Sequence, residues 1–350
     1  MAGAMETLAP IRITPPRLAS HLAATNPRGV SMATTGETRI EVTGLHAIGR
    51  GVQRPEHVVV AGEGRVFASD RASAVAELID EHTIRHIGQA GGEPNGIALD
   101  RDGHFLIANW GLGVLQDLDP ETGEITAVLR GQLDGRPLRW LNFVCVDSVG
   151  ALWCSVSTVA DDLMNTIAHG TADGFIFRGA PDRQSAHVVA EGVNFPNCMA
   201  LDRDEDYLYV VRTLTADVVR FPIEGETLGP QERFGPPLGG RRPDEFGPDH
   251  GRFLADPETS RRWGMADGCA FDAEGNLWVT LVLANKIVAV SPDGRATVVI
   301  EDPDGASLNS PTSIAWGGQD MRDIYIGSIS TPYVLKGRSS VPGLPLIHQR

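Results

Sequence analysis

The chain has 350 residues, of which 42% are apolar and 21% charged, a composition typical of a folded globular core and unlike that of disordered proteins. Its formal net charge of −15 would repel phosphate backbones and anionic lipid surfaces, so neither nucleic acid nor membrane partners are expected. The sequence lacks an apolar stretch near the roughly 20 residues that span a bilayer, and residues 1–28 lack the features of a signal peptide. We therefore expect a cytoplasmic protein.

Residues 1–37 show no regular pattern and are predicted to form a loosely docked arm, with one short helix near residues 18–24. Residues 39–48 form an isolated β-like stretch. From residue 55 onward, short segments with alternating apolar residues end repeatedly at Gly, Asp or Asn, and helical patterns are scarce. This pattern predicts an all-β fold.

The β-like segments belong to a sequence repeat that occurs six times. In each unit a strand is followed by an Asp/Gly-type turn and then by a second apolar strand, as in the segment from Ala266 through Asp272 and Gly275 to Val279. The second residues of the six units are Glu56, Asn95, Asn142, Asn197, Asp267 and Thr312. Second strands are predicted near residues 66–68, 105–107, 152–154, 208–210, 277–279 and 324–326.

The units are 39 to 70 residues apart, which is near the length of a four-stranded propeller blade with loop insertions. Third and fourth strands are predicted in most units, for example at residues 114–118 and 124–129. The sixth unit has a third strand near residues 333–336 but no fourth. We therefore predict a six-bladed β-propeller over residues 38–338, closed by the strand at residues 39–48 and followed by a C-terminal tail over residues 339–350.

The six second residues are predicted to converge, because the first strand of every propeller blade lines the central axis. A single Asn-Gly or Asp-Gly pair is more often an ordinary turn than a site. The whole set, however, contains two carboxylates, three amides and one hydroxyl, with no Lys or Arg. Such oxygen donors suit a hard divalent cation, and the absence of His and Cys disfavours a dedicated zinc site. Glu56 and Asp267 would balance the charge of the ion.

This pattern resembles the SMP-30/gluconolactonase/LRE family of six-bladed propellers, from about residue 39 to residue 338. The resemblance implies a divalent metal held by Glu56, Asn197 and Asp267, with Asn142 at metal-bound water or substrate and Asn95 close by. The donor set itself suggests that Asn142 also completes the protein shell of the ion. It also implies lactone hydrolysis, with the metal polarising the carbonyl and Asp267 as the catalytic general base. Ca²⁺ is the preferred candidate, with Mn²⁺, Mg²⁺ or Zn²⁺ as alternatives.

The chain departs from the family pattern in ways that bear on the substrate. Sugar-lactone members place an Arg two residues before the position of Asn142, whereas this chain has Trp140. Insertions at residues 158–174 and 235–265 are expected to overhang the metal and to bring apolar side chains there. The predicted substrate contacts are Asn95, Trp140, Asn109, Met164, His250 and Trp263, with Phe246 and Phe253 nearby.

The sequence therefore predicts a metal-dependent lactonase, a carboxylic ester hydrolase, that opens a hydrophobic or aryl lactone. Three alternatives remain open: a sugar-lactone hydrolase of the gluconolactonase type, a propeller synthase of the strictosidine type that needs no metal, and an interaction scaffold. The sequence leaves the oligomeric state open, with a homo-oligomer as one alternative.

The four cysteines lie in apolar segments without a CxxC pair, which favours buried thiols over disulfides.

Overall fold

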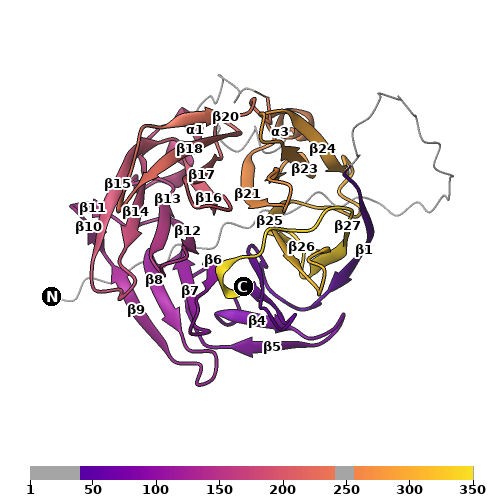
Figure 1. Ribbon diagram of the computed structural model, residues 1–350, viewed down its shortest axis with the longest axis horizontal. Helices are drawn as coiled ribbons and strands as arrows, with labels where there is room; N and C mark the ends of the chain where they lie inside the picture. Colours follow the sequence, from indigo (N-terminus) through magenta and orange to yellow (C-terminus); the bar gives the residue numbers. More distant parts are fainter. Residues whose placement is uncertain (1–39, 241–255, 350) are drawn as a thin grey trace. The chain divides into compact units, whose positions relative to one another are not determined.

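The computed structural model describes residues 40–240 and 256–349, so the N-terminal arm predicted for residues 1–37 and its short helix lie outside the described residues. Six antiparallel sheets are arranged as blades around a central axis, down which Figure 1 looks. The prediction of an all-β, six-bladed propeller is confirmed. Blades are numbered 1 to 6 below, in the order of their inner strands along the chain.

The strands of each blade follow one another from the axis outward. Blade 1 contains β2 (Val58–Val60), β3 (Val66–Ser69), β4 (Val75–Leu78) and β5 (Ile84–Ile87). Blade 2 contains β6 (Pro94–Leu99), β7 (Phe105–Asn109), β8 (Val114–Leu118) and β9 (Ile125–Arg130). Blade 3 contains β12 (Leu141–Val146), β13 (Leu152–Val156), β14 (Gly174–Gly179) and β15 (Ala186–Val193).

The other three blades follow the same plan with small variations. Blade 4 contains β16 (Pro196–Leu201), β17 (Tyr207–Arg212), β18 (Asp217–Glu224) and β20 (Glu232–Phe234), and β19 (Thr227–Leu228) pairs with the end of β18. Blade 5 contains β21 (Ala266–Phe271), β22 (Leu277–Leu281), β23 (Lys286–Val290) and β24 (Ala296–Glu301). Blade 6 contains β25 (Pro311–Gly317), β26 (Asp323–Ser328) and β27 (Val334–Ser339).

The ring closes through the predicted N-terminal strand. β1 (Val42–Ile48) is the outermost strand of blade 6 and pairs antiparallel with β27, from Val42 opposite Ser339 to Ile48 opposite Val334. Pairing of the first and last described strands in one sheet gives β27 a partner along its outer side.

Short elements outside the blades fill the connections. The hairpin of β10 (Gln132–Leu133) and β11 (Arg136–Pro137) joins blades 2 and 3. Helix α1 (Leu163–His169) lies in the first predicted insertion, and α3 (Pro257–Trp263) lies in the second. The 3-10 turn η1 (Ile347–Gln349) comes near the C-terminus. Among the described residues, no helix is long and apolar enough to cross a membrane.

The repeated Asp sets the turn between first and second strands. In blade 5, Asp272 accepts hydrogen bonds from the main-chain N–H of Asn276 at 2.9 Å and from the Trp278 indole at 2.9 Å. Asp147 and Trp153 repeat this contact in blade 3 at 3.0 Å. The buried indoles therefore join the turn to the blade core.

The blades pack face to face, and their second strands are largely apolar and buried. All five residues of β22 are buried, as are all five of β13. Three of the four cysteines are buried in this core and all four are free, which agrees with the prediction of buried thiols.

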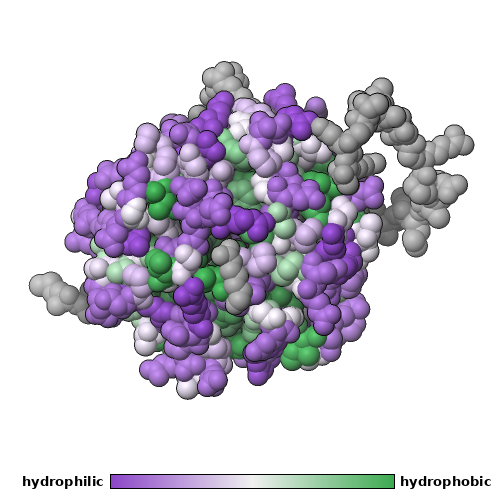
Figure 2. All heavy atoms as spheres, viewed as in Figure 1, coloured by the Kyte–Doolittle hydropathy of each residue, from purple (hydrophilic) through white to green (hydrophobic). Residues whose placement is uncertain are grey.

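The C-terminal segment covers one end of the central channel. In Figure 1, η1 lies over the middle of the ring, and Gln349 donates to the main-chain oxygens of Val60 and Trp316 at 2.9 Å. A cavity of about 110 Å³ lies inside the channel and is lined by inner-strand residues and by residues 344–349. Figure 2 shows the face that bears η1, which is mostly hydrophilic.

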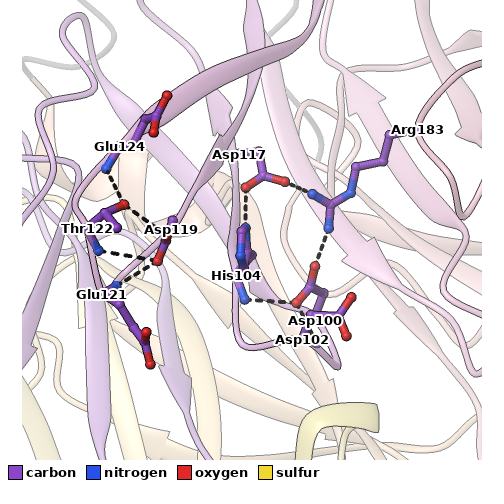
Figure 3. A network of polar contacts seen from close by, with 9 residues as sticks. All are labelled: Asp100, Asp102, His104, Asp117, Asp119, Glu121, Thr122, Glu124 and Arg183. Atoms are coloured by element: carbon purple, nitrogen blue, oxygen red, sulfur yellow. Dashed lines mark hydrogen bonds and ion pairs between the residues drawn. The ribbon is translucent and has the colours of Figure 1, made fainter.

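On this same face an ion-pair network joins blades 2 and 3 (Figure 3). Arg183, in the β14–β15 turn, forms ion pairs with Asp100 and Asp117 of blade 2. His104 contributes its Nδ1 to Asp117 at 2.7 Å and its main-chain N–H to Asp100 at 2.9 Å. The ion-pair network and η1 thus lie at the end of the channel where the inner strands finish. We call the opposite end of the channel, where the inner strands begin, the mouth.

Candidate active site

The six predicted ring residues lie at the mouth, at the starts of the inner strands. Five of them are the second residues of their strands, and Glu56 lies two residues before β2. The pairing with the second strand shifts register at this point in blades 2 to 6, for example between Pro94 and Ile97. Such bulges redirect side chains near functional sites, and here they occur at the ring positions.

Hydrogen bonds within blades 3 and 4, and one bond between blades 2 and 3, hold the amides of the ring. Asn95 Nδ2 donates to Asn142 Oδ1 at 3.2 Å, and Asn142 Nδ2 donates to Ser157 Oγ at 3.0 Å. Asn197 Nδ2 donates to Thr213 Oγ1 at 3.1 Å. Each of these amides therefore has its nitrogen bonded to protein. The oxygens of Asn95 and Asn142 each accept one protein hydrogen bond as well, but a carbonyl oxygen has a second lone pair that a cation could use.

The sixth ring residue has a different role. The Thr312 hydroxyl donates to the main-chain oxygen of Glu56 at 2.7 Å. This bond crosses from blade 6 to blade 1 and fixes the backbone that presents the Glu56 carboxylate. Thr312 therefore positions another ring residue.

The two ring carboxylates influence each other electrostatically although they come from blades 1 and 5. Burial, followed by the negative charge of Glu56, holds the pKa of Asp267 well above its ordinary value, whereas a hydrogen bond with Asn197 opposes the shift. Burial also raises the pKa of Glu56, against the lowering effect of Arg54. The raised pKa values show that the surroundings do not fully compensate the negative charge of these two acids. A bound cation would supply the missing positive charge, so the pair favours cation binding.

Arg54 is a site residue that the sequence did not predict. Its guanidinium forms an ion pair with Glu56 and donates from Nη1 to Asn95 Oδ1 at 2.9 Å. The residue has φ of 57°, a left-handed conformation that is uncommon outside glycine. None of the six ring positions holds a basic residue. Arg54, two positions before Glu56, nevertheless places its guanidinium beside the ring residues.

A buried carboxylate oxygen without a hydrogen-bond partner indicates that the ring residues can accommodate a divalent cation. Glu56 Oε2 is buried and, apart from the Arg54 ion pair, has no hydrogen-bond partner. Within residues 40–240 and 256–349, no three His, Cys, Asp or Glu side chains are grouped so as to hold a metal. A metal centre here would therefore depend on the amide oxygens of Asn142 and Asn197 beside the two carboxylates, which suits Ca²⁺ or Mg²⁺ chemistry.

An aromatic group lies beside the ring on blades 2 to 4. Trp110 contacts Trp140 with ring centroids 5.1 Å apart and Phe195 with centroids 6.4 Å apart. The Trp140 indole donates to the Ala160 carbonyl at 2.8 Å, which ties it to the insertion containing α1. Sequence reasoning identified Trp140 and missed Trp110 and Phe195, although Phe195 lies two residues before Asn197, as Trp140 does before Asn142.

The other predicted substrate contacts are placed less favourably. Asn109 is 0% exposed and its amide is fully used, donating to Gly91 O at 2.8 Å and to Gln116 Oε1 at 2.9 Å. Trp263 is 1% exposed, and its indole donates to Leu214 O at 3.1 Å. Both side chains are turned into the protein and do not join the ring residues at the mouth.

The remaining predicted contacts lie in the insertions. Met164 is half-buried in the first turn of α1. His250, Phe246 and Phe253 lie outside the described residues.

His57, next to Glu56, accepts from Ile97 N–H at 3.3 Å and packs edge-on against Phe143, and burial lowers its pKa to about 4.

Comparison with known families agrees with this architecture. Residues 114–330 match the model of the SMP-30/Gluconolactonase/LRE-like region. The chain belongs to this family. The matched residues include Asn142, Asn197 and Asp267, whereas Glu56 and Asn95 precede them in this SMP-30/gluconolactonase/LRE-like chain.

Individual relatives are distant. The chain is 25% identical to the adipocyte plasma membrane-associated protein of Danio rerio over 266 residues, 70% of this chain and 63% of the relative. It is 28% identical to the 6-deoxy-6-sulfogluconolactonase of Pseudomonas putida over 143 residues, 41% of each chain. The chain thus spans less than two thirds of the length of these two relatives. A calcium-binding regucalcin structure from Agrobacterium tumefaciens aligns with TM-score 0.62 at 18% identity, covering 89% of this chain and 98% of that one.

Proposed function

We propose that this protein is a divalent-metal-dependent lactonase that opens a cyclic ester with a hydrophobic or aryl substituent. The observation behind the proposal is the convergence of two acids from different blades, the buried Glu56 and the half-buried Asp267, beside the oxygens of Asn142 and Asn197. The relatives named as a lactonase and as a calcium-binding protein support the reaction class and the cation.

Glu56, Asn142, Asn197 and Asp267 would hold the cation. When bound, it would supply Lewis-acid polarisation of the ester carbonyl. Asn95 and Ser157 fix the Asn142 side chain from both sides, and Thr312 fixes the backbone at Glu56. These contacts preorganise the site, so that little rearrangement accompanies the reaction.

Asp267 is the proposed general base. It is less buried than Glu56, so a water at the mouth can reach it. Because a carboxylate that binds a cation is a weak base, the acidity of the attacking water must also increase at the site. Asp267 would take a proton from water while the water oxygen bonds to the carbonyl carbon. The ring C–O bond then breaks, its electron pair goes to the leaving oxygen, and the proton from Asp267 passes to that oxygen. The product is the open hydroxy acid.

The aromatic group of Trp110, Trp140 and Phe195 supports the hydrophobic substrate class. An alkyl or aryl substituent placed against these rings would be removed from water, and each buried aromatic contact can contribute roughly 1 to 3 kcal/mol. A polyhydroxylated sugar lactone would gain less there, because its hydroxyls need hydrogen-bond partners that aromatic faces lack.

The test has two parts. Chelator-treated protein should lose lactone hydrolysis and recover it with Ca²⁺ or Mn²⁺, and metal analysis should find one ion per chain. The second part compares kcat/KM for an aryl- or alkyl-substituted lactone and for an aldonolactone of the same ring size. Full activity without metal rejects the mechanism, whereas absence of both hydrolysis and bound ion favours a metal-free synthase or a scaffold. A preference for the aldonolactone rejects the hydrophobic substrate class and favours sugar-lactone hydrolysis.

A further inference from the structure

The ring residues are surrounded by a second set of six, each two positions earlier in the chain. We call this set the rim, and it consists of Arg54, Glu93, Trp140, Phe195, Met265 and Ser310. All except Glu93 have positive φ, between 44° and 60°. In four blades, 2 to 5, the rim carbonyl accepts from the residue just after the second strand, as in Ser157 N to Trp140 O at 3.1 Å. Non-glycine residues in this left-handed backbone conformation carry an energetic cost and are concentrated at functional sites.

The rim is divided into two contiguous halves. Blades 3, 4 and 5 supply apolar side chains, Trp140, Phe195 and Met265, and Trp110 packs against the first two. Blades 6, 1 and 2 supply polar side chains, Ser310, Arg54 and Glu93. A ligand at the ring would therefore have an apolar wall on one side and a polar wall on the other.

Arg54 is the cation of the polar half. Its side chain is 20% exposed, and its two side-chain contacts, to Glu56 and Asn95, leave further N–H donors of the five on a guanidinium. Glu93, its neighbour on the rim, faces a different cation, Arg71 Nη1, at 3.9 Å. If a divalent ion balances Glu56 and Asp267, the charge of Arg54 is left without a counter-charge among these ring residues.

From this arrangement we propose that Arg54 makes the site selective for lactones that carry an anionic oxyacid group, a carboxylate or sulfonate, opposite the apolar substituent. This inference rests on the proposed lactonase function and specifies its substrate class. The planar guanidinium is suited to such groups because two parallel N–H donors match two oxygens of the anion. The apolar half of the rim would receive the rest of the ligand.

The experiment uses a matched pair of substrates: one alkyl lactone whose side chain ends in a carboxylate, and its methyl ester. The wild-type protein with saturating metal should hydrolyse the acid with at least ten-fold higher kcat/KM than the ester. Arg54→Met should lower kcat/KM for the acid by 10- to 100-fold more than for the ester, and Arg54→Lys should restore part of the preference. Because each variant is scored by the ratio between two substrates, a general loss of activity cancels.

Arg139→Met is the matched control. Arg139 is another arginine next to the rim, with its side chain 48% exposed and paired with Asp161 at 3.0 Å. Its removal deletes the same charge from the apolar half and should leave the acid-to-ester ratio unchanged. No acid preference in the wild type, or an equal loss of the ratio in both variants, overturns the proposal.

Binding of the two corresponding lactams, which keep the ring and side chain, separates this inference from the proposed function. Calorimetry should give tighter binding of the carboxylate lactam to the wild type and no preference in Arg54→Met. If neither lactone is hydrolysed but the lactam preference is present, lactonase activity is wrong and the role of Arg54 in binding stands. If both lactams bind equally and both lactones are hydrolysed, the role of Arg54 is wrong and lactonase activity stands.

Discussion

Asn95 Nδ2 donates to Asn142 twice, to its main-chain oxygen at 3.0 Å and to its side-chain Oδ1 at 3.2 Å. One amide of blade 2 thus fixes both the strand and the side chain of blade 3 at the mouth. Asn95 in turn accepts from Arg54 of blade 1. A chain of contacts across three blades therefore sets the orientation of a candidate metal ligand.

Removing this support should weaken metal binding without abolishing the fold. For Asn95→Ala we expect about 10-fold weaker binding of Ca²⁺ or Mn²⁺ by calorimetry, since lost outer contacts typically cost 10- to 100-fold in affinity. Asn165→Ala, which alters an exposed Asn of α1, should bind as the wild type does. Unchanged affinity in Asn95→Ala would show that Asn142 does not depend on it.

The two carboxylates should separate in kinetics. Asp267→Asn should reduce kcat by at least roughly 100-fold at saturating metal, because positioned proton transfer contributes about 100- to 10,000-fold. Glu56→Gln should mainly weaken metal affinity, because it removes charge from a ligand. The measurement is steady-state kinetics over a metal titration. Near-wild-type kcat in Asp267→Asn would assign the base elsewhere.

The raised pKa of Asp267 predicts a pH-dependent stability of metal-free protein. Above about pH 4 the unfolded chain loses this proton first, so the folded state binds more protons and its stability decreases as pH rises. For one proton the slope reaches at most about 1.4 kcal/mol per pH unit. Urea unfolding at pH 5 to 8 should show this decrease in the wild type relative to Asp267→Asn, and Ca²⁺ should reduce it. Parallel stability curves for the two proteins would contradict the shift.

The aromatic group should determine the response to apolar substrates. Trp140→Ala should lower kcat/KM for an aryl lactone by about 10- to 100-fold, the equivalent of roughly 1 to 3 kcal/mol of buried aromatic surface. Trp140→Phe should lose less, because it keeps a ring and loses only the bond to Ala160. The aldonolactone is the internal control and should change little. Equal losses on both substrates would indicate a general structural effect.

The glycine after Asp267 should be essential for packing. A Cβ on Gly268 would lie 2.1 Å from Thr312 O and 2.8 Å from Ser313 Cα, both in the backbone of the next inner strand. Gly268→Ala should therefore destabilise the protein by about 1 to 3 kcal/mol, as overpacking does. Gly179→Ala is the control, since its Cβ meets only the Leu152 side chain at 3.4 Å. Urea midpoints measure both, and equal midpoints would contradict the close approach.

The repeat predicted the blades because turn and strand are local. Asp272 with Trp278, and Asp147 with Trp153, are separated by six residues and mark the same hairpin wherever they occur. The ring followed from the same register. The glycines after Asn95 and Asp267 suggested turns, but the structure places both in inner strands, where the neighbouring backbone leaves no room for a Cβ.

What the sequence did not reveal depends on contacts between blades. Arg54 enters the mouth through a left-handed backbone that no local pattern indicates, and its partner Asn95 belongs to the next blade. Asn109 and Trp263 are suitable residue types, but hydrogen bonds to distant backbone oxygens turn them inward. Repetition of positive φ two residues before the ring positions is visible only in three dimensions.

The pairing of β1 with β27 places the first and last strands of the propeller side by side, with Val42 opposite Ser339. On the ribosome, β1 emerges first, yet its partner is among the last segments synthesised. During translation β1 is therefore an unpaired edge, which is a site for misassociation between nascent chains. A circular permutant that begins at Gly51 and joins β1 behind β27 through a linker would make the two strands consecutive. It should complete its last blade as a local hairpin, faster than the natural order allows.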